Sequence, residues 1–90
     1  MKNNRKTISQ ETLKTSICQI SDKTDFRLKQ KGYHAWQSTH EILGIITEEY
    51  WELQEAIKNN DKDAIKKELI DIGVACHFGV ACIDENTLDW

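Results

Sequence analysis

Two acidic segments decide the fold of this 90-residue chain: Thr47-Glu48-Glu49-Tyr50-Trp51-Glu52 and Lys67-Glu68-Leu69-Ile70-Asp71. Apolar residues recur around each segment at the i, i+3, i+4 spacing of an amphipathic helix. The chain contains no proline, and little of it alternates as a strand would. A chain this short buries only a modest core. We therefore predict an all-α protein, a small antiparallel bundle of about three main helices that is completed by oligomerisation.

Capping signals divide the chain into helices. The first is expected to start near Thr7, where Thr7-Ile8-Ser9-Gln10 has the form of a capping box, and residues 21–32 are either its extension or a loop. The further boundaries are a stop at Gly32, a second helix from Tyr33 or Ala35 to about Asn59, a cap at Asn60 or Asp61, and a third helix from about Lys62 to Ile83. We expect one domain over residues 1–90, with residues 1–6 disordered.

The acidic residues lie on the wrong face for ordinary surface charge. At 100° per residue, Glu49 and Glu68 fall in the middle of their apolar stripes, and Glu52 and Asp71 fall to one side. In an antiparallel hairpin that turns at Asn60, Glu52 and Glu68 are equally far from the turn. Glu49 and Asp71 are also equally far from it. The sequence therefore predicts that Glu52 lies beside Glu68, that Glu49 lies beside Asp71, and that all four carboxylates converge.

Such a cluster needs a counter-charge, because desolvation and mutual repulsion both disfavour it. Lys67 lies near the Asp71 side and supplies only part of that charge. A divalent cation satisfies the cluster better, and oxygen ligands favour Mg²⁺, Mn²⁺ or Ca²⁺. A di-iron site would need Glu-x-x-His on two helices; no histidine follows a glutamate at that spacing. The other alternative is a solvated acidic face with a few chance inward positions.

Composition excludes several classes of protein. The chain has 12 basic and 15 acidic residues and a net charge of −3, which argues against a nucleic-acid binder. The basic N-terminus is not followed by the apolar run of a secretory signal, and no stretch is long enough to span a membrane. Three cysteines, Cys18, Cys76 and Cys82, form no even disulfide framework. We expect reduced, mostly buried thiols in a cytoplasmic protein.

The acidic pattern resembles that of the MazG-like, all-α nucleoside triphosphate pyrophosphatases. Their hallmark is EExxE, a variable gap, and ExxD, which Glu48-Glu49-x-x-Glu52 and Glu68-x-x-Asp71 reproduce. The resemblance covers about residues 34–83. It implies Mg²⁺-dependent hydrolysis of (deoxy)nucleoside triphosphates to the monophosphate and pyrophosphate, with house-cleaning of aberrant nucleotides as the usual theme.

The resemblance also implies roles for single residues. The implied metal ligands are Glu49, Glu52, Glu68 and Asp71. The implied cofactor is Mg²⁺, with Mn²⁺ as a substitute. Glu48 becomes an auxiliary acid that orients ligands or a water, so the catalytic set is Glu48, Glu49 and Glu52. The substrate-binding candidates are Tyr33, His34, Trp36 and Lys67, the first three as stacking partners of a base. The alternative for those three is packing at the start of a helix.

The chain departs from the family pattern after Cys82, where the usual downstream Lys, Asn or Arg positions are absent. We expect Arg27, Lys29 and Lys31, or another subunit, to replace them. The alternative function is a non-catalytic nucleotide- or metal-binding module, or a helical interaction protein, with a degenerate site. Trp51 points away from the predicted hairpin, as a subunit contact in a homodimer or homotetramer would.

Overall fold

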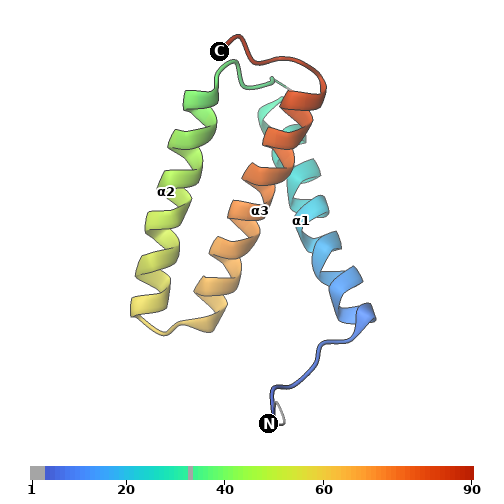
Figure 1. Cartoon of the computed structure of the whole chain (residues 1–90), viewed down its shortest axis with the longest axis vertical. Helices are drawn as coiled ribbons and strands as arrows, with labels where there is room; N and C mark the ends of the chain where they lie inside the picture. The colour runs from blue at the N-terminus through green and yellow to red at the C-terminus, as the bar shows by residue number, and fades with distance from the viewer. Residues whose placement is uncertain (1–3, 33) are drawn as a thin grey trace.

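The computed structural model describes residues 4–32 and 34–90, and these residues form three helices (Figure 1). Helix α1 is Gln10–Lys31, α2 is Thr39–Lys58 and α3 is Lys62–Asp84. The prediction of an all-α fold with three main helices is confirmed. The predicted disorder of residues 1–6 falls partly on residues 1–3, which lie outside the described residues.

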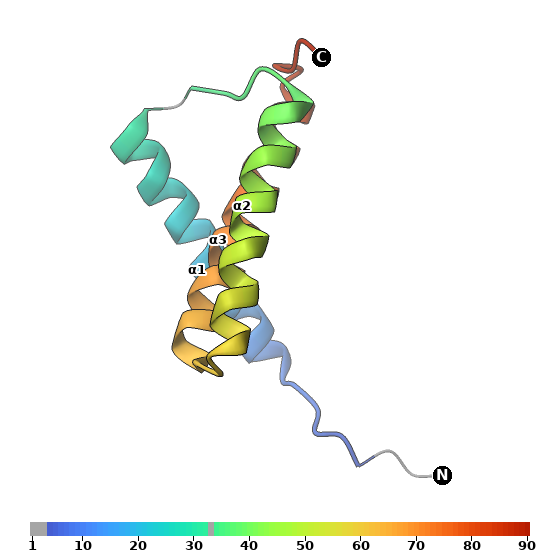
Figure 2. The same cartoon turned by 90° about the vertical axis from the view of Figure 1, so that its left-hand side faces the viewer.

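Helix α3 is the centre of the arrangement. It runs antiparallel to α2 on one side and packs against α1 on the other (Figure 1). Within residues 4–32 and 34–90, α1 makes no packing contact with α2. The C-terminal half of α1 instead leans away from α2 (Figure 2). Residues from α1 and α2 therefore meet only around α3.

The turn between α2 and α3 fixes the register of the hairpin. Asn60 adopts a positive φ of 52°, a conformation that asparagine tolerates better than most residues. Its backbone N–H donates to the carbonyl of Ile57 at 3.0 Å. Asp61 then caps α3, because its side chain accepts a hydrogen bond from the backbone N–H of Ala64 at 3.1 Å. The predicted turn and the Asp61 cap are confirmed.

Two predicted helix starts are wrong by a few residues. Helix α1 begins at Gln10 and not near Thr7, because Ser9 is the cap and accepts a bond from the N–H of Thr12. Helix α2 begins at Thr39 and not at Tyr33 or Ala35. Its cap is Ser38, whose hydroxyl accepts from the N–H of Glu41 at 3.2 Å. Residues 21–31 extend α1, which ends at Gly32 with a φ of 87°.

The C-terminal segment holds the loop before α2 in place. The N–H of Asp89 donates to the carbonyl of Gln37 at 2.6 Å, and the N–H of Thr39 donates to the carbonyl of Trp90 at 2.6 Å. The Thr87 hydroxyl donates to the carbonyl of Trp36 at 3.0 Å. These bonds satisfy backbone groups in a segment that has no regular structure of its own.

The core of a single chain is thin. Its buried hydrophobic residues, among those described, are Ala56, Ala75 and Cys82. Helices α1 and α3 approach closely at Gly73, where an added Cβ would lie 2.8 Å from the Cδ1 atom of Ile20. The expectation of mostly buried thiols is wrong, because Cys18 and Cys76 are exposed. Solvent therefore reaches one thiol on α1 and one on α3.

Candidate metal centre

The hairpin brings three carboxylates together at its centre. Each of Glu49, Glu68 and Asp71 offers an oxygen within 4.8 Å of the others. Glu68 and Asp71 come from α3 and are only 8% and 9% exposed. Glu49 comes from α2 and is half-buried. The mid-stripe positions of Glu49 and Glu68 thus place these side chains between the helices.

The other two acids of the pattern lie at or beyond the edge of this cluster. Glu52 is exposed, but its carboxyl group lies close enough to Glu68 to raise the pKa of that group. Glu52 therefore extends the cluster toward solvent without joining the group of three. Glu48 is exposed on α2 and lies outside the group.

Crowding shifts the acidity of the central carboxyl groups. Burial is the largest cause that raises the pKa of Glu49 to about 7. The neighbouring carboxylates raise that pKa further, and the guanidinium of Arg27 lowers it. Burial is also the largest cause that raises the pKa of Glu68. The interaction with Glu52 and then the charge of Asp71 raise this pKa further, and the charge of Lys67 lowers it. The negative charge at this position is thus only partly compensated by the chain itself.

Two buried oxygens show what the cluster lacks. The Oε2 atoms of Glu49 and Glu68 are buried and have no hydrogen-bond partner in the described part of the chain. Buried acceptors without a partner are rare and costly. Carboxylate oxygens at close range are also the ligands that Mg²⁺ and Mn²⁺ prefer. The residues present therefore fit a divalent cation held by Glu49, Glu68 and Asp71.

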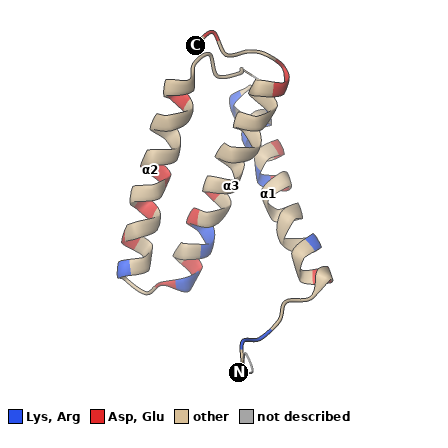
Figure 3. Ribbon diagram, viewed as in Figure 1, with Lys and Arg blue, Asp and Glu red and all other residues tan. Residues whose placement is uncertain are grey.

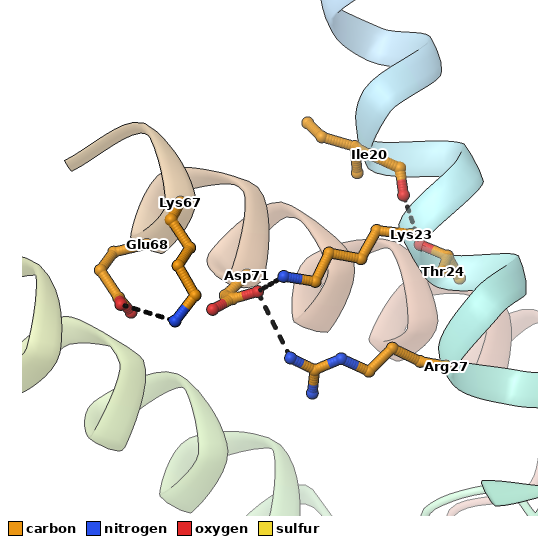
Figure 4. Close-up of polar contacts among 7 residues, drawn as sticks. All are labelled: Ile20, Lys23, Thr24, Arg27, Lys67, Glu68 and Asp71. Atoms are coloured by element: carbon orange, nitrogen blue, oxygen red, sulfur yellow. Dashed lines mark hydrogen bonds and ion pairs between the residues drawn. The ribbon is translucent and has the colours of Figure 1, made fainter. Parts of the chain in front are cut away.

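The cations of the chain reach mainly one side of the cluster (Figure 4). Lys23 of α1 places its Nζ atom 2.6 Å from Oδ1 of Asp71, and Nη2 of Arg27 lies 3.4 Å from the same oxygen. On the other side, Nζ of Lys67 lies 4.0 Å from Oε1 of Glu68. In Figure 3 most charged residues of α2 are acidic, whereas α1 and α3 carry residues of both signs.

A cavity of about 180 Å³ opens next to the cluster, and all three helices contribute to it. Glu49 and Asp71 line it together with Arg27 and Lys31 of α1. Its aromatic wall contains Trp36 and Phe78, whose rings meet edge to face with centroids 4.9 Å apart. The cavity therefore combines acidic, basic and aromatic surfaces, as a site for a charged, ring-containing ligand would.

The structure separates the predicted substrate-binding residues. His34 and Trp36 line the cavity, whereas Tyr33 lies outside the described residues. The side chain of Lys67 is 68% exposed and does not line the cavity. Lys29, expected to help replace the downstream basic groups, is exposed and also lies away from it.

Sequence reasoning missed Lys23 and Phe78. Lys23 was missed because residues 21–32 could have been a loop, and in a loop the sequence does not show which way a side chain points. The signal that identifies it is the spacing of four between Lys23, Arg27 and Lys31, which places the three side chains along one side of a helix. Phe78 carried no signal beyond its place in an apolar stretch.

The fold and the site define a small, all-α domain with a buried acidic cluster beside a cavity. Residues 37–86 match the MazG nucleotide pyrophosphohydrolase domain, which covers more than half of the chain. The protein therefore belongs to this family, and the predicted resemblance is confirmed. No curated protein matches the chain, and no solved structure does. None of the described helices is both long enough and apolar enough to cross a membrane.

Magnesium should stabilise the folded protein through the carboxylate cluster. We expect Mg²⁺ to raise the melting temperature, since a ligand at a hundredfold excess over its dissociation constant stabilises by about 2.7 kcal/mol. The variant Glu68→Gln removes one ligand and one repelling charge. It should melt higher than the parent without metal and lose most of the increase that Mg²⁺ gives, as measured by differential scanning calorimetry.

The matched control is Glu85→Gln, which removes the same charge from the exposed C-terminal cap of α3. It should keep the full effect of Mg²⁺. An equal response to Mg²⁺ in the Glu68→Gln and Glu85→Gln variants would contradict the assignment of the site.

Proposed function

We propose that this protein hydrolyses (deoxy)nucleoside triphosphates to the monophosphate and pyrophosphate, with Mg²⁺ as cofactor and Mn²⁺ as a substitute. Membership of the MazG family indicates a nucleotide pyrophosphohydrolase and a nucleotide substrate. The observation that carries the proposal is the buried three-carboxylate cluster beside a cavity with basic and aromatic walls. House-cleaning of the nucleotide pool is the role that such an activity would serve.

In this proposal the carboxylate cluster binds the cation, and the cavity binds the base of the nucleotide. Glu49, Glu68 and Asp71 would hold the cation, and Glu52 would complete the ligand set at the edge of the cluster. The cation, when bound, neutralises charge on the triphosphate and polarises its phosphoryl oxygens. Trp36 would pack against the base on the aromatic wall of the cavity.

The reaction needs a water molecule that is aligned with the α-phosphorus. Water attacks this atom, the bond to the bridging oxygen breaks, and pyrophosphate leaves while a proton passes to a carboxylate. Glu52 is exposed and contacts Glu68, so it can hold a water molecule and accept its proton at the edge of the cluster. We assign Glu48, the exposed acid one residue before Glu49, to orient ligands or water from the same turn of α2.

We also propose that the chain assembles as a homodimer or homotetramer. Helix α2 carries Leu43, Tyr50 and Ile57 at intervals of seven residues, and all three side chains are exposed. Trp51 lies beside them and is 67% exposed. Apolar residues at heptad spacing bury themselves well against a second helix, and a thin single-chain core gives the assembly a reason to form.

The activity itself is tested by release of pyrophosphate from a panel of canonical and modified deoxynucleoside triphosphates with Mg²⁺. We expect the parent to release pyrophosphate and the Glu52→Gln variant to lose at least about a hundredfold, within the usual range for loss of a general base. Circular dichroism should show that the variant keeps its helices. Stabilisation by Mg²⁺ without any pyrophosphate release would contradict the enzyme and favour the non-catalytic binding module.

The assembly is tested by multi-angle light scattering of the metal-loaded protein at micromolar concentration. The expected mass is two or four times the 10.5 kDa of one chain. Trp51→Glu should reduce this mass, because burying an unpaired charge in a subunit contact is costly. Ile8→Glu, which alters an exposed apolar residue before α1, should leave it unchanged. A monomeric parent would overturn the proposal.

A further inference from the structure

Helix α1 carries a row of cations along the side that faces the candidate site. Lys23, Arg27 and Lys31 are four residues apart, so they lie along one side of the helix over roughly 12 Å. Lys23 and Arg27 contact Asp71, and Arg27 and Lys31 line the cavity. The row therefore runs from the carboxylate cluster along the wall of the cavity.

These cations lie outside the part of the chain that matches the MazG domain, which begins at residue 37. The family assignment therefore gives them no role. They do not serve the core either, since the side chains of Lys23 and Arg27 are 28% and 38% exposed. The contacts that the structure shows for both side chains are ion pairs with Asp71.

The two contacts with Asp71 differ in strength. The 2.6 Å contact of Lys23 is that of a tight ion pair. The 3.4 Å contact of Arg27 is much longer than the about 2.7–2.9 Å of a strong charge-assisted hydrogen bond. In the described part of the chain, this is the one hydrogen bond that the Arg27 guanidinium makes. Arg27 can therefore leave Asp71 at little cost, whereas Lys23 remains.

A polyphosphate is the ligand that suits the N–H donors of Arg27 and Lys31. A guanidinium presents five N–H donors in a planar fork that matches a phosphate group, and an ammonium binds phosphate as a point charge. Lys31 is exposed, lines the cavity and has no ion-pair partner among the described residues. A cation on the carboxylate cluster would also repel Arg27 and favour its transfer to a negative ligand.

We infer that Arg27 and Lys31 bind the phosphate chain of the substrate, and that Arg27 exchanges Asp71 for a phosphate group when the substrate enters. This inference rests on the proposed function, because it takes a triphosphate as the ligand of the same cavity. Lys23 stays with Asp71 and keeps that carboxylate in position. Helix α1 thus supplies basic groups to the cavity from outside residues 37–86, which match the family.

The test uses the full chain and inorganic tripolyphosphate with saturating Mg²⁺, so that no base and no hydrolysis of a nucleotide are needed. Isothermal titration calorimetry should show binding to the parent. Arg27→Gln and Lys31→Gln should each weaken it about tenfold, since hydrogen bonds to charged groups contribute about that much. Arg27→Lys should fall between the parent and Arg27→Gln, because it keeps the charge and loses the fork.

The matched control is Lys29→Gln, which removes the same charge from the same helix but from an exposed position away from the cavity. It should bind tripolyphosphate as the parent does. Equal affinity in the Lys29→Gln, Arg27→Gln and Lys31→Gln variants would overturn the inference, and so would the absence of tripolyphosphate binding to the parent.

The result of this binding test can be told apart from the result of the pyrophosphate-release test. If the parent releases pyrophosphate but the three variants bind alike, the activity stands and the inference fails. If the parent releases no pyrophosphate but its tripolyphosphate binding depends on Arg27 and Lys31, the inference stands and the activity fails. In an active parent, Lys31→Gln should raise KM more than it lowers kcat, which a purely structural role for Lys31 would not produce.

Discussion

Negative charge held between two helices is the constraint on which this structure depends. Glu68 and Asp71 are buried on the face of α3 that ordinarily carries apolar side chains, and Glu49 faces them from α2. Charges taken out of water cost several kcal/mol each unless they are paired. The chain pairs one oxygen of Asp71 closely, through Lys23, and leaves the Oε2 atoms of Glu49 and Glu68 without partners. The hairpin is therefore arranged around a position that favours a cation.

The rest of the molecule can be understood as support for that position. The Asn60 turn and the Asp61 cap set the heights at which the acids meet. Helix α1 packs on α3 and brings Lys23 and Arg27 next to Oδ1 of Asp71. The C-terminal segment holds the loop that carries Trp36, which places an aromatic ring at the wall of the cavity. A core this thin gains too little from apolar packing to offset the cost of buried acids, which favours a bound cation.

The fold could be predicted from the sequence where periodicity and capping agreed. The α2–α3 hairpin has strong apolar stripes and an Asn-Asn-Asp turn, so the turn followed directly and the cap was narrowed to Asn60 or Asp61, of which Asp61 is the cap. The start of α2 did not follow, because Ala35 and Ser38 continue the apparent stripe toward the N-terminus, and the actual cap is Ser38. The bonds that hold Trp36 and Gln37 in the loop before the helix come from Thr87 and Asp89, and such long-range contacts leave no local pattern.

The candidate site could also be predicted only in part. Helical phase is enough to place Glu49, Glu68 and Asp71 together, because each lies on or beside an inner stripe. It does not show that Glu52 stays at the edge of the cluster, since this depends on how closely the helices pack. Arg27 and Lys31 of α1 were expected to supply basic groups, but the contact of Lys23 with Asp71 could not be predicted, because it depends on how α1 packs against α3 near Gly73.

The account depends most directly on where a divalent cation binds. Crystals soaked in Mn²⁺ can be measured at a wavelength at which manganese scatters anomalously. The account predicts an anomalous peak bounded by the carboxylates of Glu49, Glu68 and Asp71, at the about 2.0–2.2 Å metal–oxygen distances typical of such small, hard cations. A cluster without a peak, or a peak only at exposed acids such as Glu48 or Glu85, would contradict it.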